Sequence, residues 1–336
     1  MSREGDAWLD RYTVTAFGTE MTLLEVLDHE HVDWQRVRRT AFLIHQHFRY
    51  DYPGPIEDLN HRLVIVPPEQ HLDQRRVVHR LEVSSEVADV MTRHDQFGNV
   101  VFDVHVPFVG ESIDFEAWIV VERRSGYPAA GLGDPAAGLG DPAAGLGDPA
   151  SVDVHHLGDR LFLDPSSRTH ADDALRTVAR GLRAESRGGA ELAGRINTWV
   201  YEHMRYRHDV TDIHTTAAEA LSLGHGVCQD YAHVMIALCR LCGLAARYAS
   251  GHLLGEGGTH AWVEVLLPDE RDRRARVQPF DPTHGREPGL SYVTVAVGRD
   301  YEDVAPTSGT FRASHGGRLS SRKRVGLAVV DYQPEE

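Results

Sequence analysis

Hydrophobic side chains recur with a period of two in the first part of the chain. Phe42, Ile44, Phe48 and Tyr50 follow this spacing, and residues 100–106 repeat it. Because a strand turns successive side chains to opposite faces, the spacing predicts half-buried β-strands. Further strands are expected over 63–66 and 113–121, with a hairpin turn at Phe97-Gly98-Asn99. We therefore expect a small antiparallel β domain over 39–125, preceded by an N-terminal extension over 1–38.

The period changes in the second part of the chain. Leu192, Ile196, Trp199 and Val200 fall on one face of a helix. Further helices are expected over 216–223 and 228–242, and strands over 245–250, 260–267 and 277–280. Helices followed by strands within one unit predict an α+β domain, here over 151–310. A Gly/Ser/Arg-rich C-terminal tail is expected over 311–336.

A repeat separates these two parts of the chain. The block Ala-Ala-Gly-Leu-Gly-Asp-Pro occurs three times in succession between Ala129 and Pro149. Gly and Pro in every block oppose a helix, and one Leu per block is too little to bury a core. Residues 126–150 are therefore expected to be a flexible Gly/Pro/Ala linker.

Net charge, cysteine count and the lack of long apolar runs disfavour several classes of protein. The formal net charge of −15 over 336 residues disfavours nucleic acid and anionic membranes as partners. The chain has only three cysteines, all within residues 228–242, which is unlike a disulfide-stapled secreted domain. It shows neither an apolar run long enough to span a membrane nor a signal peptide at its start. A cytoplasmic location is expected.

Candidate chemistry begins at Cys228. Two glycines break the chain just before it, in Gly224-His225-Gly226-Val227-Cys228, and a predicted helix follows. A cysteine in the first turn of a helix lies at the positive end of the helix dipole, which favours the nucleophilic thiolate. Most free cysteines are simply small buried side chains, so position alone does not establish a nucleophile.

A thiolate nucleophile needs a proton acceptor, and that acceptor needs an orienting group. The strand predicted from His260 places His260, Trp262 and Glu264 on one face, with Ala261, Val263 and Val265 on the other. Asp281 ends a later strand in Phe280-Asp281-Pro282-Thr283, where it is able to accept a hydrogen bond from His260. The order Cys228, His260, Asp281 on helix, strand and strand predicts a catalytic triad.

These stretches resemble the bacterial transglutaminase-like family, often described as containing cysteine proteases. The motifs are Gly226-Val227-Cys228-Gln229-Asp230-Tyr231, His260-Ala261-Trp262-Val263-Glu264-Val265 and Phe280-Asp281-Pro282-Thr283. The β-rich region is similar to the domain that precedes the core in that family. The resemblance implies a papain-like core, in which a helix carries the Cys and an antiparallel sheet carries the His and Asp. It also implies a nucleophilic Cys228, with His260 as base and acid and Asp281 as its orienter.

The expected activity is that of a cysteine enzyme acting on protein or peptide amide bonds. A thioester on Cys228 would be resolved by water or by an amine, and the sequence does not choose between them. The alternative is a catalytically silent interaction module with the same fold.

No cofactor and no metal are expected, since the 21 histidines include no His-Glu-x-x-His motif. The Cys239-x-x-Cys242 pair lies late in a helix, which favours packing over redox chemistry.

Overall fold

The computed structural model describes residues 14–16, 19–21, 27–125, 151–153, 160–268 and 274–334. The predicted linker over 126–150 lies outside the described residues, and the predicted extension over 1–38 is described only in part. Its short hairpin consists of β1 (Val14–Ala16) and β2 (Thr19–Met21). No helix in these described ranges is long and apolar enough to cross a membrane.

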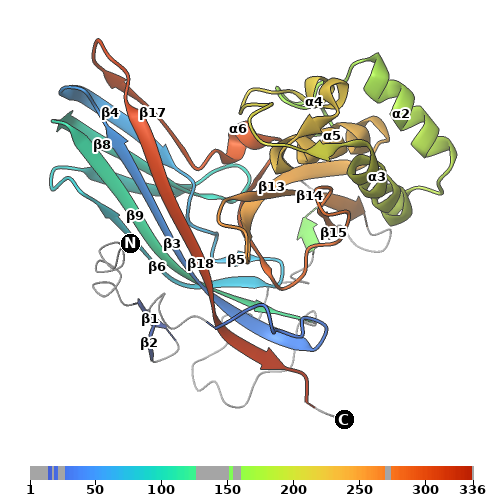
Figure 1. Cartoon of the computed structure of the whole chain (residues 1–336), viewed down its shortest axis with the longest axis horizontal. Helices are drawn as coiled ribbons and strands as arrows, with labels where there is room; N and C mark the ends of the chain where they lie inside the picture. The colour runs from blue at the N-terminus through green and yellow to red at the C-terminus, as the bar shows by residue number, and fades with distance from the viewer. Residues whose placement is uncertain are drawn as a thin grey trace.

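Two antiparallel sheets form the β-rich half of the molecule (Figure 1). The first sheet has the order β18-β3-β9-β6-β5, with β18 (Arg318–Tyr332), β3 (Val37–Asp51), β9 (Ser112–Arg124), β6 (Gln74–Val83) and β5 (Gln70–His71). The second has the order β17-β4-β8-β7, with β17 (Thr307–Arg312), β4 (Ile56–Leu63), β8 (Val100–Val109) and β7 (Asp89–His94). The predicted strand over 63–66 differs from the structure, because β4 ends at Leu63.

The alternation seen in the sequence decides which side chains enter the core of this half. Phe42, Ile44 and Phe48 of β3 are buried in one cluster with residues of β4, β8 and β9. Leu43 joins a different cluster, with Trp118. Strand β3 therefore buries hydrophobic side chains on both of its faces. Because successive side chains point to opposite faces, Phe42 and Ile44 enter one cluster and Leu43 the other.

The C-terminal residues are not a tail apart from the domains, which corrects the expectation for 311–336. β18 pairs with β3 along nearly its whole length, and β17 pairs with β4. Leu327 is fully buried, and Val325 packs against the same core. The composition gives no sign of this strand because only Gly326 and Leu327 of β18 are buried, and its backbone pairs with a strand more than 260 residues away.

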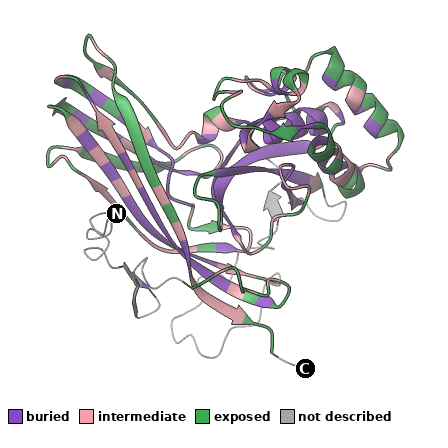
Figure 2. Cartoon of the chain, viewed as in Figure 1, coloured by how far each residue is buried: buried purple, intermediate pink, exposed green. Residues whose placement is uncertain are grey.

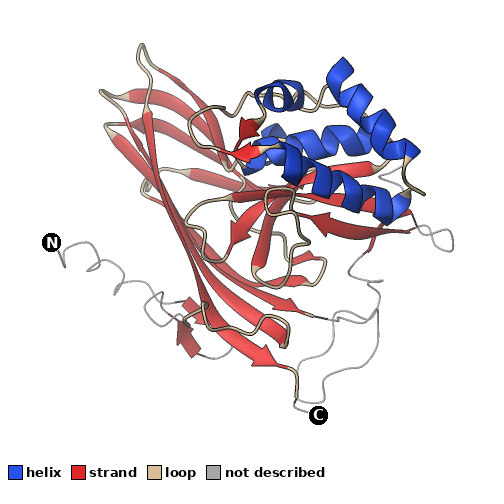
Figure 3. Ribbon diagram, turned by 45° about the vertical axis from the view of Figure 1, so that its right-hand side comes forward, coloured by secondary structure: helices blue, strands red, loops and turns tan. Residues whose placement is uncertain are grey.

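The other half is an α+β unit, as predicted, with helices on one face of an antiparallel sheet (Figure 3). The sheet has the order β10-β15-β14-β13-β16, with β10 (Ser151–Asp153), β15 (Arg274–Phe280), β14 (His260–Pro268), β13 (Ala245–Leu253) and β16 (Tyr292–Gly298). The helices are α2 (Asp173–Ala184), α3 (Gly189–His203), α4 (Ala217–Leu223), α5 (Cys228–Leu241) and the short α6 (Tyr301–Val304). A two-residue parallel pair joins β11 (Arg205–Tyr206) to β12 (His225–Gly226).

Helix α5 lies at the centre of this unit. Residues 229–240 are all buried, and Figure 2 shows α5 between the sheet and the more exposed outer helices. Helix α4 leads the chain toward α5. The hydroxyl of Thr216 accepts the Glu219 N–H at the start of α4, and Gly224 ends it with a φ of +64°. That left-handed conformation favours glycine and turns the chain back toward α5.

Amide side chains from the β-rich half cover the edge of the α+β sheet. The Asn99 side chain accepts the Val297 N–H over 2.8 Å and donates to the Val297 carbonyl over 2.7 Å. Gln74 binds both backbone groups of Thr294 in the same way, at 2.8 and 2.7 Å. Each amide thus makes the two hydrogen bonds that a neighbouring strand would make with β16. Another chain therefore cannot pair with β16 at these residues.

Candidate active site

Cys228 is the first residue of α5 and is partly exposed. The turn before it is held by Asp230, whose Oδ2 accepts the Val227 N–H over 2.8 Å and the Thr211 hydroxyl over 2.7 Å. Burial raises the pKa of Asp230. A Cβ on Gly226 would lie 2.5 Å from Asp230 Oδ2, so only glycine allows this close approach. The glycine two residues before Cys228 therefore allows the turn that sets the position of the Cys228 thiol at the start of α5.

His260 and Asp281 lie at adjacent strand ends. His260 begins β14, Asp281 directly follows β15, and the two strands are antiparallel neighbours. His260 Nε2–H donates to Asp281 Oδ2 over 2.8 Å, and the two side chains are 2% and 0% exposed. Because burial excludes water from this pair, the ring of His260 is held in one orientation.

The two faces of β14 separate His260 from the core under α5, as the sequence predicts. Ala261, Val263 and Val265 join the core under α5. Trp262 packs on the opposite face against Tyr292, with ring centroids 5.5 Å apart. His260 lies on the Trp262 face, where its ring centroid is 6.0 Å from that of Tyr292.

Electrostatics favours the charged form of His260. Burial by itself would lower the pKa of His260, but the hydrogen bond to Asp281 and the interaction with the nearby Cys228 outweigh it and raise the pKa to about 10. Burial would likewise raise the pKa of Asp281, yet the hydrogen bond from His260 and the one from His284 hold that pKa well below its ordinary value. The structure thus joins His260 and Asp281 by a hydrogen bond and brings Cys228 close to His260. Their catalytic roles stay a prediction.

Three further side chains belong to this group and were not singled out from the sequence. Asp281 Oδ2 also accepts the Tyr292 hydroxyl over 2.7 Å and His284 Nδ1–H over 2.7 Å. Glu256 approaches the two histidines from the loop between β13 and β14. His284 follows the Phe-Asp-Pro-Thr motif directly, which is a signal that sequence reasoning passed over. Tyr292 and Glu256 carry no such signal, because their distance from Asp281 is set by the fold.

The other cysteines and two further histidines near Cys228 are buried or bound to the backbone. Cys239 and Cys242 are buried free thiols on α5 and at its end, and burial raises the pKa of both. His233 is fully buried, and burial lowers its pKa to about 4. His225 Nδ1 donates to the Leu223 carbonyl over 2.8 Å. The expectation that Cys239 and Cys242 pack rather than form a redox pair agrees with their place in the core.

One cluster among the described residues has the composition of a metal site. Ligand atoms of His260, Asp281 and His284 lie within 4.8 Å of one another. Each histidine already donates a hydrogen bond to Asp281 Oδ2. These hydrogen bonds account for the clustering without an ion.

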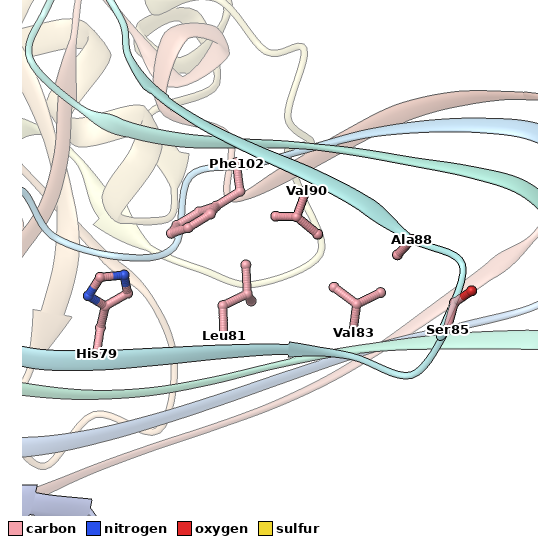
Figure 4. Close-up of a pocket in the computed structure, with 7 residues that line it drawn as sticks. All are labelled: His79, Leu81, Val83, Ser85, Ala88, Val90 and Phe102. Atoms are coloured by element: carbon pink, nitrogen blue, oxygen red, sulfur yellow. The ribbon is translucent and has the colours of Figure 1, made fainter.

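A hollow of about 370 Å³ lies elsewhere, in the β-rich half (Figure 4). It opens between β6 and the pair β7 and β8, and side chains from both sides point into it. The lining is mostly apolar: His79, Leu81, Val83, Ser85, Ala88, Val90 and Phe102. No residue of the Cys228 group lines it.

Comparison with known proteins shows the family of the chain. The model of the transglutaminase-like superfamily matches residues 176–281, and that of the bacterial transglutaminase-like N-terminal region matches residues 42–122. The chain is 32% identical over 253 residues to the uncharacterized protein Rv2569c of Mycobacterium tuberculosis, covering 72% of this chain and 78% of that one. A Mycobacterium leprae protein, ML0607, is 31% identical over 161 residues, covering 44% and 54%. The chain belongs to the bacterial transglutaminase-like family.

A solved structure shares the fold. A "Putative Cysteine Protease from Cytophaga hutchinsonii" superposes with a TM-score of 0.65 over 89% of this chain and 94% of that one, at 18% sequence identity. That likeness confirms the predicted architecture, in which a transglutaminase-like α+β core follows a β-rich domain. The division of the chain at residues 39, 126, 151 and 311 remains a prediction, apart from the correction to the C-terminal residues.

Proposed function

We propose that the protein is a cysteine enzyme that cleaves or transfers amide bonds of proteins or peptides through a thioester on Cys228. The observation that carries the proposal is the buried His260–Asp281 pair, which lies close to a partly exposed cysteine at the start of a helix. An imidazolium at that place stabilises a thiolate beside it. A packing role for Cys228 would not need a histidine held by a carboxylate.

The first half of the reaction forms the thioester. The Cys228 thiolate attacks the amide carbonyl carbon, a C–S bond forms, and the carbonyl electron pair moves onto oxygen. His260 Nε2 is bound to Asp281, so Nδ1 is the nitrogen that gives its proton to the departing amide nitrogen. The C–N bond then breaks, which releases an amine and leaves the acyl group on sulfur.

The second half resolves the thioester. Water or a primary amine attacks the carbonyl carbon, His260 takes the proton, and the thiolate of Cys228 leaves. The oxyanion needs a fixed donor in both halves. As the first residue of α5, Cys228 has a backbone N–H with no acceptor inside the helix. We assign this N–H as one oxyanion donor.

A search for acyl donors tests the proposal. The protein is incubated with a peptide library and a labelled primary amine, and products of hydrolysis and of amine incorporation are identified by mass spectrometry. Wild-type protein is expected to produce one or both, and Cys228→Ala neither. Equal product from Cys228→Ala would remove the proposal and favour the interaction module, while the ratio of the two products separates hydrolysis from acyl transfer.

A further inference from the structure

A second histidine and a second carboxylate close a ring of side chains around His260. His260 Nε2 and His284 Nδ1 both donate to Asp281 Oδ2, over 2.8 and 2.7 Å. On the other side, Glu256 Oε1 lies 3.3 Å from His284 Nε2, and Glu256 Oε2 lies 3.3 Å from His260 Nδ1. Imidazole and carboxylate groups therefore alternate around the ring, and each histidine has a carboxylate at both nitrogens.

The backbone fixes where His284 stands in this ring. Asp281 and Arg286 exchange two backbone hydrogen bonds, of 2.7 and 3.2 Å, across a tight turn. Inside the turn, Asp281 Oδ1 accepts the Thr283 N–H over 2.9 Å. Gly285 has a φ of +64° and lies against the ring of Tyr201, where a Cβ would approach to 2.8 Å. The turn therefore has a single shape, and it directs His284 back at Asp281.

The charges in the ring alternate as well. Hydrogen bonds to Asp281 and Glu256 raise the pKa of His284 to about 9, so both of its nitrogens carry protons near neutral pH. The hydrogen bond from His284 in turn lowers the pKa of Glu256. A doubly protonated His284 is thus able to donate to Asp281 and to Glu256 at the same time.

We propose that His284 is a positioning residue, which holds the Asp281 carboxylate in the orientation that aims His260 Nδ1 at Cys228. This inference rests on the proposed function, since it gives His284 a part in the reaction at Cys228. Asp281 Oδ2 takes three donors, from β14, from the turn after β15 and from the first residue of β16. Without the donor from the turn, Oδ2 keeps only His260 and the Tyr292 hydroxyl, so the carboxylate is held less firmly and the ring of His260 loses part of its orientation. Glu256 anchors His284 from the opposite side.

Other titratable groups surround this ring, and a test by pH has to take them into account. Cys228 faces His260 from α5. Tyr206 of β11 lies near the ring as well. Burial raises the pKa of Tyr206, and the nearby charges of Cys228 and Glu256 raise it further. Arg286 donates to the Tyr292 hydroxyl over 3.1 Å. These groups stay unchanged in every variant below, so differences between the variants report on His284 alone.

Two substitutions of His284 each keep one of its two contacts and remove the other. In His284→Asn, the side-chain amide takes the place of Nδ1 and keeps a donor to Asp281. In His284→Gln, the amide takes the place of Nε2 and keeps a donor to Glu256. Both remove the same charge and the same ring, and the His284 side chain is 33% exposed, so neither opens a cavity in the core. His105→Gln, at an exposed histidine on β8, is the matched control.

The readout is the rate of Cys228 alkylation by iodoacetamide against pH, with sites assigned by peptide mass spectrometry. Only the thiolate reacts, so the profile reports how well His260 supports it without need of a substrate. His284→Gln is expected to alkylate about tenfold more slowly than wild type near pH 6, the effect of losing one hydrogen bond to a charged group. His284→Asn and His105→Gln are expected to follow the wild-type profile.

The outcomes separate this inference from the proposed function. If wild-type Cys228 is no more reactive than Cys239, the proposed function fails first. If wild-type Cys228 is selectively reactive and His284→Gln keeps its profile, the role of His284 is refuted while the nucleophile stands. Equal slowing in both His284 variants, or slowing in His284→Asn alone, also refutes it, because the effect would then not follow the bond to Asp281. Circular dichroism spectra identical to wild type confirm that each variant is folded.

Discussion

Replacement of Asn99 by alanine tests how the two halves of the molecule are held together. Asn99 is 1% exposed and binds both backbone groups of Val297, which is 3% exposed. Alanine leaves a buried N–H and a buried C=O without partners. A buried polar group that loses its partner costs roughly 1–3 kcal/mol. With two such groups, we expect Asn99→Ala to lower the free energy of unfolding by about 2–6 kcal/mol.

The assay is urea unfolding followed by tryptophan fluorescence and by circular dichroism. Asn60→Ala is the matched control, because Asn60 is exposed and its amide donates only to the nearby Asp58 carbonyl, over 3.0 Å. An exposed substitution of this kind is expected to change stability by less than about 0.5 kcal/mol. Asn99→Ala should move the midpoint of unfolding well beyond the control. Equal midpoints for the two variants would show that the amide does not stabilise the edge of β16.

Further predictions concern the site and the linker. Cys228→Ala is expected to abolish amide turnover with less than about 1 kcal/mol of lost stability, measured by product analysis and urea unfolding, since Cys228 is partly exposed. The folded pKa of His260 is about 10, above its ordinary 6.5, so its ion pair with Asp281 stabilises the protein fully below pH 6.5 and loses that effect as pH rises through about 10. The stability difference between wild type and Asp281→Asn should therefore shrink between those pH values in urea unfolding. Removal of one seven-residue block from 129–149 should shift the unfolding free energy by only tenths of a kcal/mol, and a loss of several would contradict the reading as a linker.

The sequence predicts the three central side chains because each has a local signature. Cys228 follows a glycine break at a helix start, His260 opens an alternating strand, and Asp281 precedes a proline that ends one. The strands of the α+β sheet and the helices around α5 are likewise predicted from local periodicity. Each of these signals lies within about ten residues of the group that it identifies.

The features that the sequence does not predict depend on contacts between distant segments. The sequence predicts a turn at Asn99, and nothing near it indicates that its amide covers an edge strand 198 residues away. Glu256 lies in Gly255-Glu256-Gly257-Gly258, a glycine-rich stretch without the lysine of a phosphate-binding loop and with no local sign of a catalytic group. The loop instead brings a carboxylate to two histidines. The strand over 318–332 was missed for the same reason, since its partner β3 is far away in sequence.

The central claim, that Cys228 carries the acyl group, is tested most directly by trapping the intermediate. Wild-type protein is mixed with an acyl-donor peptide, quenched in acid, and the Cys228 peptide is weighed by mass spectrometry. We predict a mass gain equal to the acyl fragment that neutral hydroxylamine removes, because hydroxylamine cleaves thioesters, with no gain in His260→Ala. Turnover of the same peptide with no adduct on Cys228, and at an equal rate in Cys228→Ala, would contradict the account.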